Sequence, residues 1–115
     1  MAKSLTQHIE TARPGSGAVS SELMLKARKA SDFLKALAHE NRLMILCLLA
    51  ERERSVTELE GLLALSQATV SQQLARLRHE GLVETRRDGR TIYYSLPDDS
   101  TRKFIQAIYD KFCGP

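Results

Sequence analysis

The sequence has 115 residues, of which 43% are hydrophobic and 27% charged, a balance typical of a soluble globular chain with one core. No apolar run approaches the roughly 20 residues that span a bilayer, and the N-terminus lacks the apolar segment of a secretion signal. We therefore expect a cytoplasmic protein with no membrane partner. The net charge of +3 permits binding to nucleic acid without proving it.

Residues 1–19 contain a Pro-Gly-Ser-Gly run and little apolar periodicity, so we expect a flexible tail followed by one domain over residues 20–115. Ser20 or Ser21 can cap a first helix that reaches residue 37. Its apolar positions recur every three or four residues and include Leu23, Ala27, Ala30, Leu34 and Leu37. Such a helix either completes the core or packs a surplus apolar face on a partner, and the helix alone leaves both open.

A second helix is predicted over residues 42–50, where almost every side chain is apolar. A helix that is apolar all round is typically buried, so this is the expected central helix, and it carries Cys47. The charged run at residues 51–54 is interpreted as a solvated turn.

Two short helices follow. Ser55 and Glu58 match a capping box, which predicts a helix that ends near Ala64. Ser66 can cap the next helix, in which Val70, Leu74 and Leu77 occupy one apolar face. Two short helices joined by such a turn form a helix-turn-helix, whose second helix enters the DNA major groove.

The polar face of that second helix carries hydroxyls, amides and a guanidinium, groups that hydrogen-bond base edges and phosphates. A polar surface helix without DNA contacts is the alternative. The candidate DNA-binding residues here are Ser66, Gln67, Thr69, Ser71, Gln72 and Arg76.

After Gly81 the pattern changes to β-type segments over residues 82–87 and 91–96, separated by Asp88-Gly89, a strong hairpin signal. Arg86, Arg87 and Arg90 surround the turn. A hairpin after a recognition helix is a wing whose arginines contact phosphates or a narrow minor groove. A merely solvated basic tip is the alternative.

Asp98, Asp99 or Ser100 can cap a last helix that ends near Cys113. Its apolar stripe is a second candidate for a dimer face. The stripe comprises Phe104, Ile105, Ile108, Tyr109 and Phe112. The predicted fold is mainly α with a small β-hairpin, a winged helix-turn-helix of order α-α-α-α-β-β-α.

Residues from about 34 to 113 closely resemble the ArsR/SmtB family of bacterial dimeric repressors. The resemblance implies a homodimer built from the first and last helices, bound to an inverted repeat in double-stranded operator DNA and released by an inducer. The residues that carry it are Ala36-Leu37-Ala38-His39-Glu40-Asn41-Arg42-Leu43, Leu65-Ser66-Gln67, Val70-Ser71-Gln72-Gln73-Leu74, Leu77-Arg78, Gly81-Leu82-Val83, Gly89-Arg90 and Tyr93-Tyr94.

The best-known inducers of that family are metal ions, and here the sequence departs from the pattern. Ser55 and Thr57 stand where metal-sensing members have cysteines, and neither is a soft-metal ligand. The last helix contains no histidine, and two cysteines cannot close a tetrahedral zinc site. We therefore expect no metal and no cofactor.

Cys47 on the central helix and Cys113 at the end of the last helix resemble the pair found in the persulfide-sensing branch of the family, the BigR and SqrR type. That resemblance implies that reactive sulfur species are the inducer and that the two sensing thiols become bridged. A structural, buried role is the alternative for Cys47.

The leading hypothesis is thus a repressor that leaves its operator when the pair reacts with persulfides. General thiol oxidation by peroxide or disulfides and a winged-helix interaction module that binds no DNA are the alternatives. An enzyme is disfavoured, because the sequence shows no nucleophile–base–acid set and no Gly-rich phosphate loop.

Overall fold

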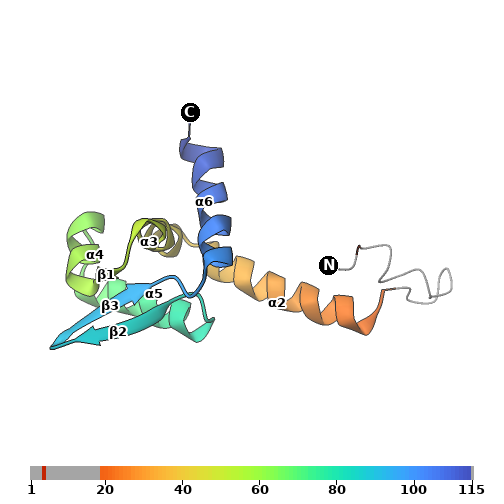
Figure 1. The fold of residues 1–115 in the computed structure, drawn as a ribbon, viewed down its shortest axis with the longest axis horizontal. Helices are drawn as coiled ribbons and strands as arrows, with labels where there is room; N and C mark the ends of the chain where they lie inside the picture. Colours follow the sequence, from red (N-terminus) through yellow and green to blue (C-terminus); the bar gives the residue numbers. More distant parts are fainter. Residues whose placement is uncertain (1–3, 5–18, 115) are drawn as a thin grey trace. The chain divides into compact units, whose positions relative to one another are not determined.

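The structure is a computed structural model that describes Ser4 and residues 19–114 (Figure 1). Most of the predicted tail over residues 1–19 therefore lies outside the described residues. The chain divides into two compact units, Met1–Lys35 and Ala36–Pro115, and the division falls inside helix α2 (Ser21–Leu37).

Helix α2 begins as the sequence predicts, because the Ser20 hydroxyl accepts a hydrogen bond from the Leu23 backbone N–H at 3.1 Å. Only Ala36 and Leu37, at its end, are buried. The apolar side chains of Met24, Leu25 and Leu34 are exposed, Leu34 by 52%. Most of the apolar surface of α2 is therefore unburied within one chain.

The second unit contains four further helices and three strands. Their bounds are α3 (Glu40–Glu51), β1 (Arg54–Ser55), α4 (Val56–Leu63), α5 (Gln67–His79), β2 (Glu84–Asp88), β3 (Thr91–Ser95) and α6 (Asp99–Cys113). The winged helix-turn-helix predicted from the sequence is confirmed. In Figure 1 the hairpin of β2 and β3 extends past α4 and α5, and α6 stands beside α3.

The three strands form one antiparallel sheet in the order β1-β3-β2. Strand β1 is an addition that the sequence did not predict, and it pairs Arg54 with Tyr94. In the hairpin Asp88 pairs with Thr91, which leaves Gly89 in a tight turn with a φ of +63°. Glycine adopts this left-handed conformation without strain.

The core of this unit lies where α3, α4, α5 and α6 meet. Ile45, Leu46 and Leu49 of α3 are fully buried, as is Ile105 of α6. The predicted solvated turn over residues 51–54 is wrong for Arg54, which is only 8% exposed. Its guanidinium Nε donates to the Leu48 carbonyl at 3.1 Å, so Arg54 satisfies a carbonyl at the end of α3.

Candidate functional site

The helix-turn-helix is formed by α4 and α5. The capping box at the start of α4 is complete, because the Ser55 hydroxyl accepts from the Glu58 N–H and the Glu58 carboxylate accepts from the Ser55 N–H. Helix α4 ends at Ala64, whose φ of 55° is left-handed. Ser66 then caps α5 by accepting from the Thr69 N–H at 3.2 Å. These caps fix where each helix starts and therefore how α5 is presented.

Helix α5 has one buried and one exposed face, as its periodicity predicts. Val70, Leu74 and Leu77 are fully buried and hold the helix on the core. The opposite face presents a row of polar side chains to solvent. This row comprises Gln67, Ser71, Gln72 and Arg76. The exposed groups can both donate and accept hydrogen bonds, which is what reading base edges requires.

Three of the predicted contact residues at the start and on the face of α5 are already engaged within the chain. The Ser66 hydroxyl lies 2.9 Å from the Thr69 hydroxyl, in addition to its role as the cap of α5. Arg76 lies in an ion pair with Glu80 of the same helix, with an Nε to Oε1 distance of 3.5 Å. That pair is exposed and therefore weak, so the Arg76 guanidinium can exchange Glu80 for another anion.

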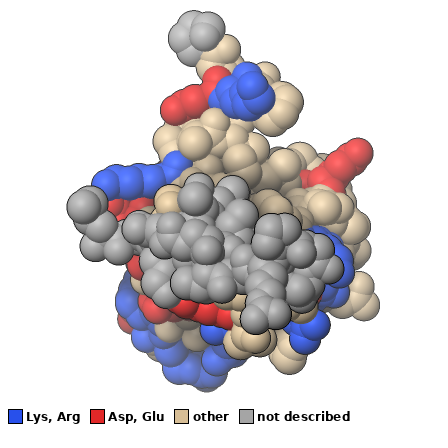
Figure 2. Space-filling model, turned by 90° about the vertical axis from the view of Figure 1, so that its right-hand side faces the viewer, with Lys and Arg blue, Asp and Glu red and all other residues tan. Residues whose placement is uncertain are grey.

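The three wing arginines differ in their surroundings. Arg86 donates two hydrogen bonds to the Glu53 carboxylate and stacks over the Tyr93 ring, 4.7 Å from its centroid. Arg87 and Arg90 are exposed on the hairpin. Figure 2 presents the side opposite to the tip of the hairpin, and on that face Lys and Arg side chains gather at the lower end with Asp and Glu side chains among them. Arg86 thus braces the wing, whereas Arg87 and Arg90 extend from it.

A hollow of about 260 Å³ lies between the start of α4, the start of α5 and the wing. Gln67 and Arg90, both predicted contact residues, line it together with Thr57 and Thr91. The sequence did not single out these two threonines as DNA contacts, because the pairing of β1 with β3 is what brings the start of α4 beside the wing. Their hydroxyls add hydrogen-bonding groups to the surface between α5 and the wing.

Helix α5 is also connected to α3, the helix that carries Cys47. Arg42 of α3 donates from its Nη1 to the Oε1 of Gln73 at 3.0 Å, and from its Nε to the Ala36 carbonyl at 2.6 Å. At the other end of α3, Arg102 of α6 donates to the Ala50 carbonyl at 2.5 Å. Charged hydrogen bonds therefore join α3 both to α5 and to α6.

The two cysteines are free thiols that line one groove. The groove lies between α3, α4 and α6 and has a volume of about 390 Å³. Cys47 is half-buried on α3, and Cys113 is exposed at the end of α6. The structure thus brings the predicted sensing residues together although 65 residues of chain separate them.

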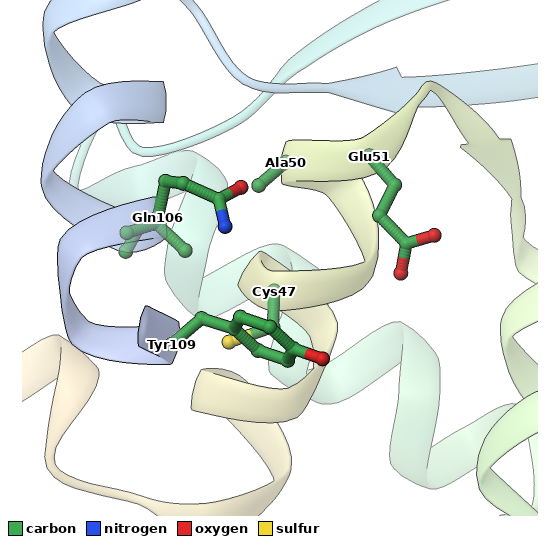
Figure 3. A pocket seen from close by; sticks show the side chains of 6 residues that line it. Cys47, Ala50, Glu51, Gln106 and Tyr109 are labelled. Atoms are coloured by element: carbon green, nitrogen blue, oxygen red, sulfur yellow. The ribbon is translucent and has the colours of Figure 1, made fainter. Parts of the chain in front are cut away.

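Cys47 also lines a second, smaller pocket of about 190 Å³ between α3 and α6 (Figure 3). Cys47, Ala50 and Glu51 reach this pocket from α3, and Gln106 and Tyr109 reach it from α6. Cys47, Glu51 and Tyr109 are common to the pocket and the groove. The Cys47 sulfur is therefore approached from two sides, and only one of them holds Cys113.

The surroundings of Cys47 disfavour its thiolate. Burial raises the pKa of the Cys47 thiol above the ordinary value of 9.0, and the negative charges of Cys113 and Glu51 raise this pKa further. A thiolate is the nucleophile in sulfur exchange, so this environment disfavours Cys47 as the nucleophile of a first attack at neutral pH.

No three His, Cys, Asp or Glu side chains among Ser4 and residues 19–114 are placed to hold a metal ion together. Within the same described part of the chain, no helix combines the length and apolar character needed to cross a membrane.

Comparison with known proteins gives one consistent family. Residues 39–85 match the sequence profile described as bacterial regulatory protein, arsR family. A biofilm growth-associated repressor of Agrobacterium fabrum is 47% identical over 90 residues, which cover 78% of this chain and 77% of that protein. The transcriptional activator HlyU of Vibrio cholerae is 42% identical, with coverage of 80% of this chain and 85% of HlyU.

Solved structures agree with the sequences. Reduced HlyU from Vibrio cholerae has a TM-score of 0.76 at 42% identity, covering 80% of this chain and 97% of HlyU. The transcriptional repressor BigR from Xylella fastidiosa has a TM-score of 0.72 at 40% identity, covering 82% of this chain and 96% of BigR.

Proposed function

We propose that this chain, which belongs to the ArsR family of bacterial regulatory proteins, represses transcription and leaves its operator when reactive sulfur species bridge Cys47 and Cys113. Family membership makes the chain a transcription regulator. The single observation that carries the rest is that both thiols line one groove between α3, α4 and α6.

The operator-binding surface is the exposed face of α5 together with the wing. Gln67, Ser71, Gln72 and Arg76 read the major groove, and Arg87 and Arg90 contact flanking phosphates. Ser66 and Thr69 fix the start of α5, where free backbone N–H groups meet a phosphate. Arg86 supports the wing through Glu53 and Tyr93.

The active species is a homodimer that binds an inverted repeat. One chain leaves apolar side chains exposed on both α2 and α6, namely Leu34 at 52% and Phe112 at 77%. Exposed apolar surface of this kind is typical of an interface. Two copies that pack through these helices place two α5 helices at half-sites one turn of DNA apart.

The chemistry needs both thiols. The first thiolate attacks the sulfane sulfur of a persulfide RSSH, which becomes attached as a protein persulfide while RSH leaves. A second persulfide converts the other thiol in the same way. The outer sulfur of one protein persulfide then attacks the inner sulfur of the other, so that a trisulfide bridge forms and hydrogen sulfide leaves. The exposure of Cys113 and the raised pKa of Cys47 favour Cys113 as the first nucleophile.

Closing the bridge changes how α3 and α6 are held, and α3 is hydrogen-bonded to α5 through Arg42 and Gln73. A small change in the angle between the two α5 helices of a dimer alters the half-site spacing that they can match. Coupling of about 1–3 kcal/mol, which is typical of allostery, is sufficient for release.

General oxidation of the same thiols is the second candidate, since both are free and line one groove. It requires Cα atoms about 4.4–6.8 Å apart in the bridged form. It predicts release by peroxide without added sulfur.

The test uses a DNA duplex selected for binding from a random pool. Reduced wild type and Cys47→Ser should bind it equally, and persulfide treatment should release only the wild type. Mass spectrometry of the released protein should show inserted sulfur atoms or, for simple oxidation, only the loss of two hydrogens. Release of Cys47→Ser by persulfide overturns the assignment of the sensor.

A further inference from the structure

The groove that holds both thiols has an apolar wall. Five aliphatic side chains line it, from α3 and α4: Leu43, Met44, Leu48, Leu62 and Leu63. The ring of Tyr109 covers the side formed by α6. A molecule that approaches Cys47 through this groove must therefore lose water from its own surface, which is favourable for apolar groups and costly for charged ones.

The charges along the groove also favour neutral molecules over anions. Among the described residues that line it, Glu51 alone carries a formal charge while both thiols are protonated. The Glu51 carboxylate lies four residues after Cys47 on α3, and Arg54 is its ion-pair partner at 3.6 Å. The Glu51 charge still contributes to the raised pKa of Cys47, so this carboxylate acts on the groove in spite of Arg54.

We propose that this groove is a substrate-binding site that selects neutral, apolar sulfane-sulfur donors and rejects anionic ones. The proposal rests on the proposed function, because it concerns the donor that bridges the same two thiols. It specifies alkyl polysulfides and alkyl hydropersulfides as the preferred class, with Glu51 as a specificity residue that disfavours carboxylate-bearing donors.

A symmetrical trisulfide R–S–S–S–R gives a fully balanced reaction. The Cys113 thiolate attacks the central sulfur and expels one RS⁻, which takes up a proton. Cys47 then loses its proton to solvent and attacks the same sulfur, expelling the second RS⁻. The products are one trisulfide bridge between Cys113 and Cys47 and two RSH molecules. The donor is the oxidant, so no other oxidant is needed.

The test compares two donors of similar size and the same reacting group, dipropyl trisulfide and the trisulfide of mercaptopropionic acid. Mass spectrometry follows the gain of one sulfur atom less two hydrogens in the reduced full-length protein. Each rate is divided by the rate of the same donor with mercaptoethanol, a neutral thiol, which removes intrinsic differences in reactivity. We expect the normalised rate to be about tenfold higher for the dipropyl donor, the equivalent of roughly two buried methylene groups.

Two variants that each remove one negative charge distinguish a local effect of Glu51 on donor selection from an effect of the net charge of the protein. Glu51→Gln should raise the rate of the anionic donor about threefold, the effect of removing one partly screened charge, and leave the dipropyl rate within twofold. Glu84→Gln removes a carboxylate from β2, away from the groove, and should change neither rate.

Equal normalised rates for the two donors overturn the proposal, and so does an identical response of both variants. These outcomes differ from a failure of the proposed function, in which the bridged protein keeps its full affinity for DNA whichever donor has formed the bridge.

Discussion

The Nη1 of Arg42 lies 3.0 Å from the Oε1 of Gln73, so a guanidinium on the helix that carries Cys47 holds an amide on the recognition helix. Gln73 is half-buried and lies between the fully buried Leu74 and the exposed polar row of α5. This hydrogen bond therefore joins α3, which carries Cys47, to α5, which carries the surface proposed to bind DNA.

Removing that connection should weaken both binding and regulation. Gln73→Ala leaves the core face of α5 unchanged and deletes one charge-assisted hydrogen bond, worth about 1–2 kcal/mol. We expect operator affinity to fall by about fivefold or more and the difference between reduced and bridged protein to shrink. Fluorescence anisotropy with both forms measures this. A variant with weaker binding but an undiminished difference would show that the signal bypasses Gln73.

The salt dependence of operator binding should distinguish the wing arginines that contact phosphates from the one that supports the wing. Each phosphate contact contributes about 0.9 to the slope of log affinity against log salt concentration. Arg87→Ala or Arg90→Ala should lower this slope by about one. Arg86→Ala should weaken binding with the slope nearly unchanged, because Arg86 is held by Glu53 and Tyr93.

Glu53→Gln is the matched control for the bracing role, since it removes the partner of Arg86 and leaves every wing arginine in place. It should reproduce the weaker binding of Arg86→Ala. If instead Arg86→Ala lowers the slope by one and Glu53→Gln binds normally, Arg86 is a phosphate contact.

The reactivity of Cys47 should depend on pH in a defined direction. Burial and the charges of Cys113 and Glu51 raise the pKa of Cys47, so half of this thiol is ionised only at a pH above 9.0. In Cys113→Ser, the rate of alkylation by iodoacetamide should still be rising with pH above that value. The contribution of Cys47 to folding stability also depends on pH. Because the pKa of Cys47 is raised in the folded protein, this contribution is fully present below pH 9.0 and is lost as the pH rises through the raised pKa. A rate plateau near neutral pH would contradict this environment.

The apolar end of α6 should be needed for assembly. Phe112 is 77% exposed in one chain, and its burial against a second copy is worth about 2 kcal/mol. A symmetric dimer contains this residue twice, so Phe112→Ser should raise the dimer dissociation constant by about a thousandfold, measured by sedimentation equilibrium. Lys103→Ser, an exposed change on the same helix, should leave the constant unaltered. A dimer of unchanged stability would place the interface elsewhere.

Local patterns in the sequence predicted most of the fold, because caps and periodicity act over a few residues. Ser20, Ser55, Ser66 and Asp98 cap the helices that follow them. Strand β1 was not predicted, because a strand of two residues is too short to show a periodic pattern and its pairing with Tyr94 is a long-range contact. The burial of Arg54 was not predicted either, because it depends on the same pairing with Tyr94 and on a hydrogen bond to the Leu48 carbonyl of α3.

The candidate site likewise contains features that local sequence patterns predict and features that depend on contacts between distant residues. The exposed row of α5 follows from helix geometry, and the sequence predicts Gln67, Ser71, Gln72 and Arg76 correctly, whereas Thr69, predicted on the same face, is half-buried. The bracing of Arg86 by Glu53 joins positions 33 residues apart and needs the folded sheet. The groove around Cys47 and Cys113 needs three helices in place, so the sequence supplied the two thiols but not their apolar wall or Glu51.

The most direct test is the operator affinity of homogeneous protein before and after Cys47 and Cys113 are bridged by sulfur. We predict that bridging weakens binding by tenfold or more, that reductant restores it, and that Cys47→Ser keeps its affinity throughout. Bridged protein that binds the operator as tightly as the reduced form would contradict the account.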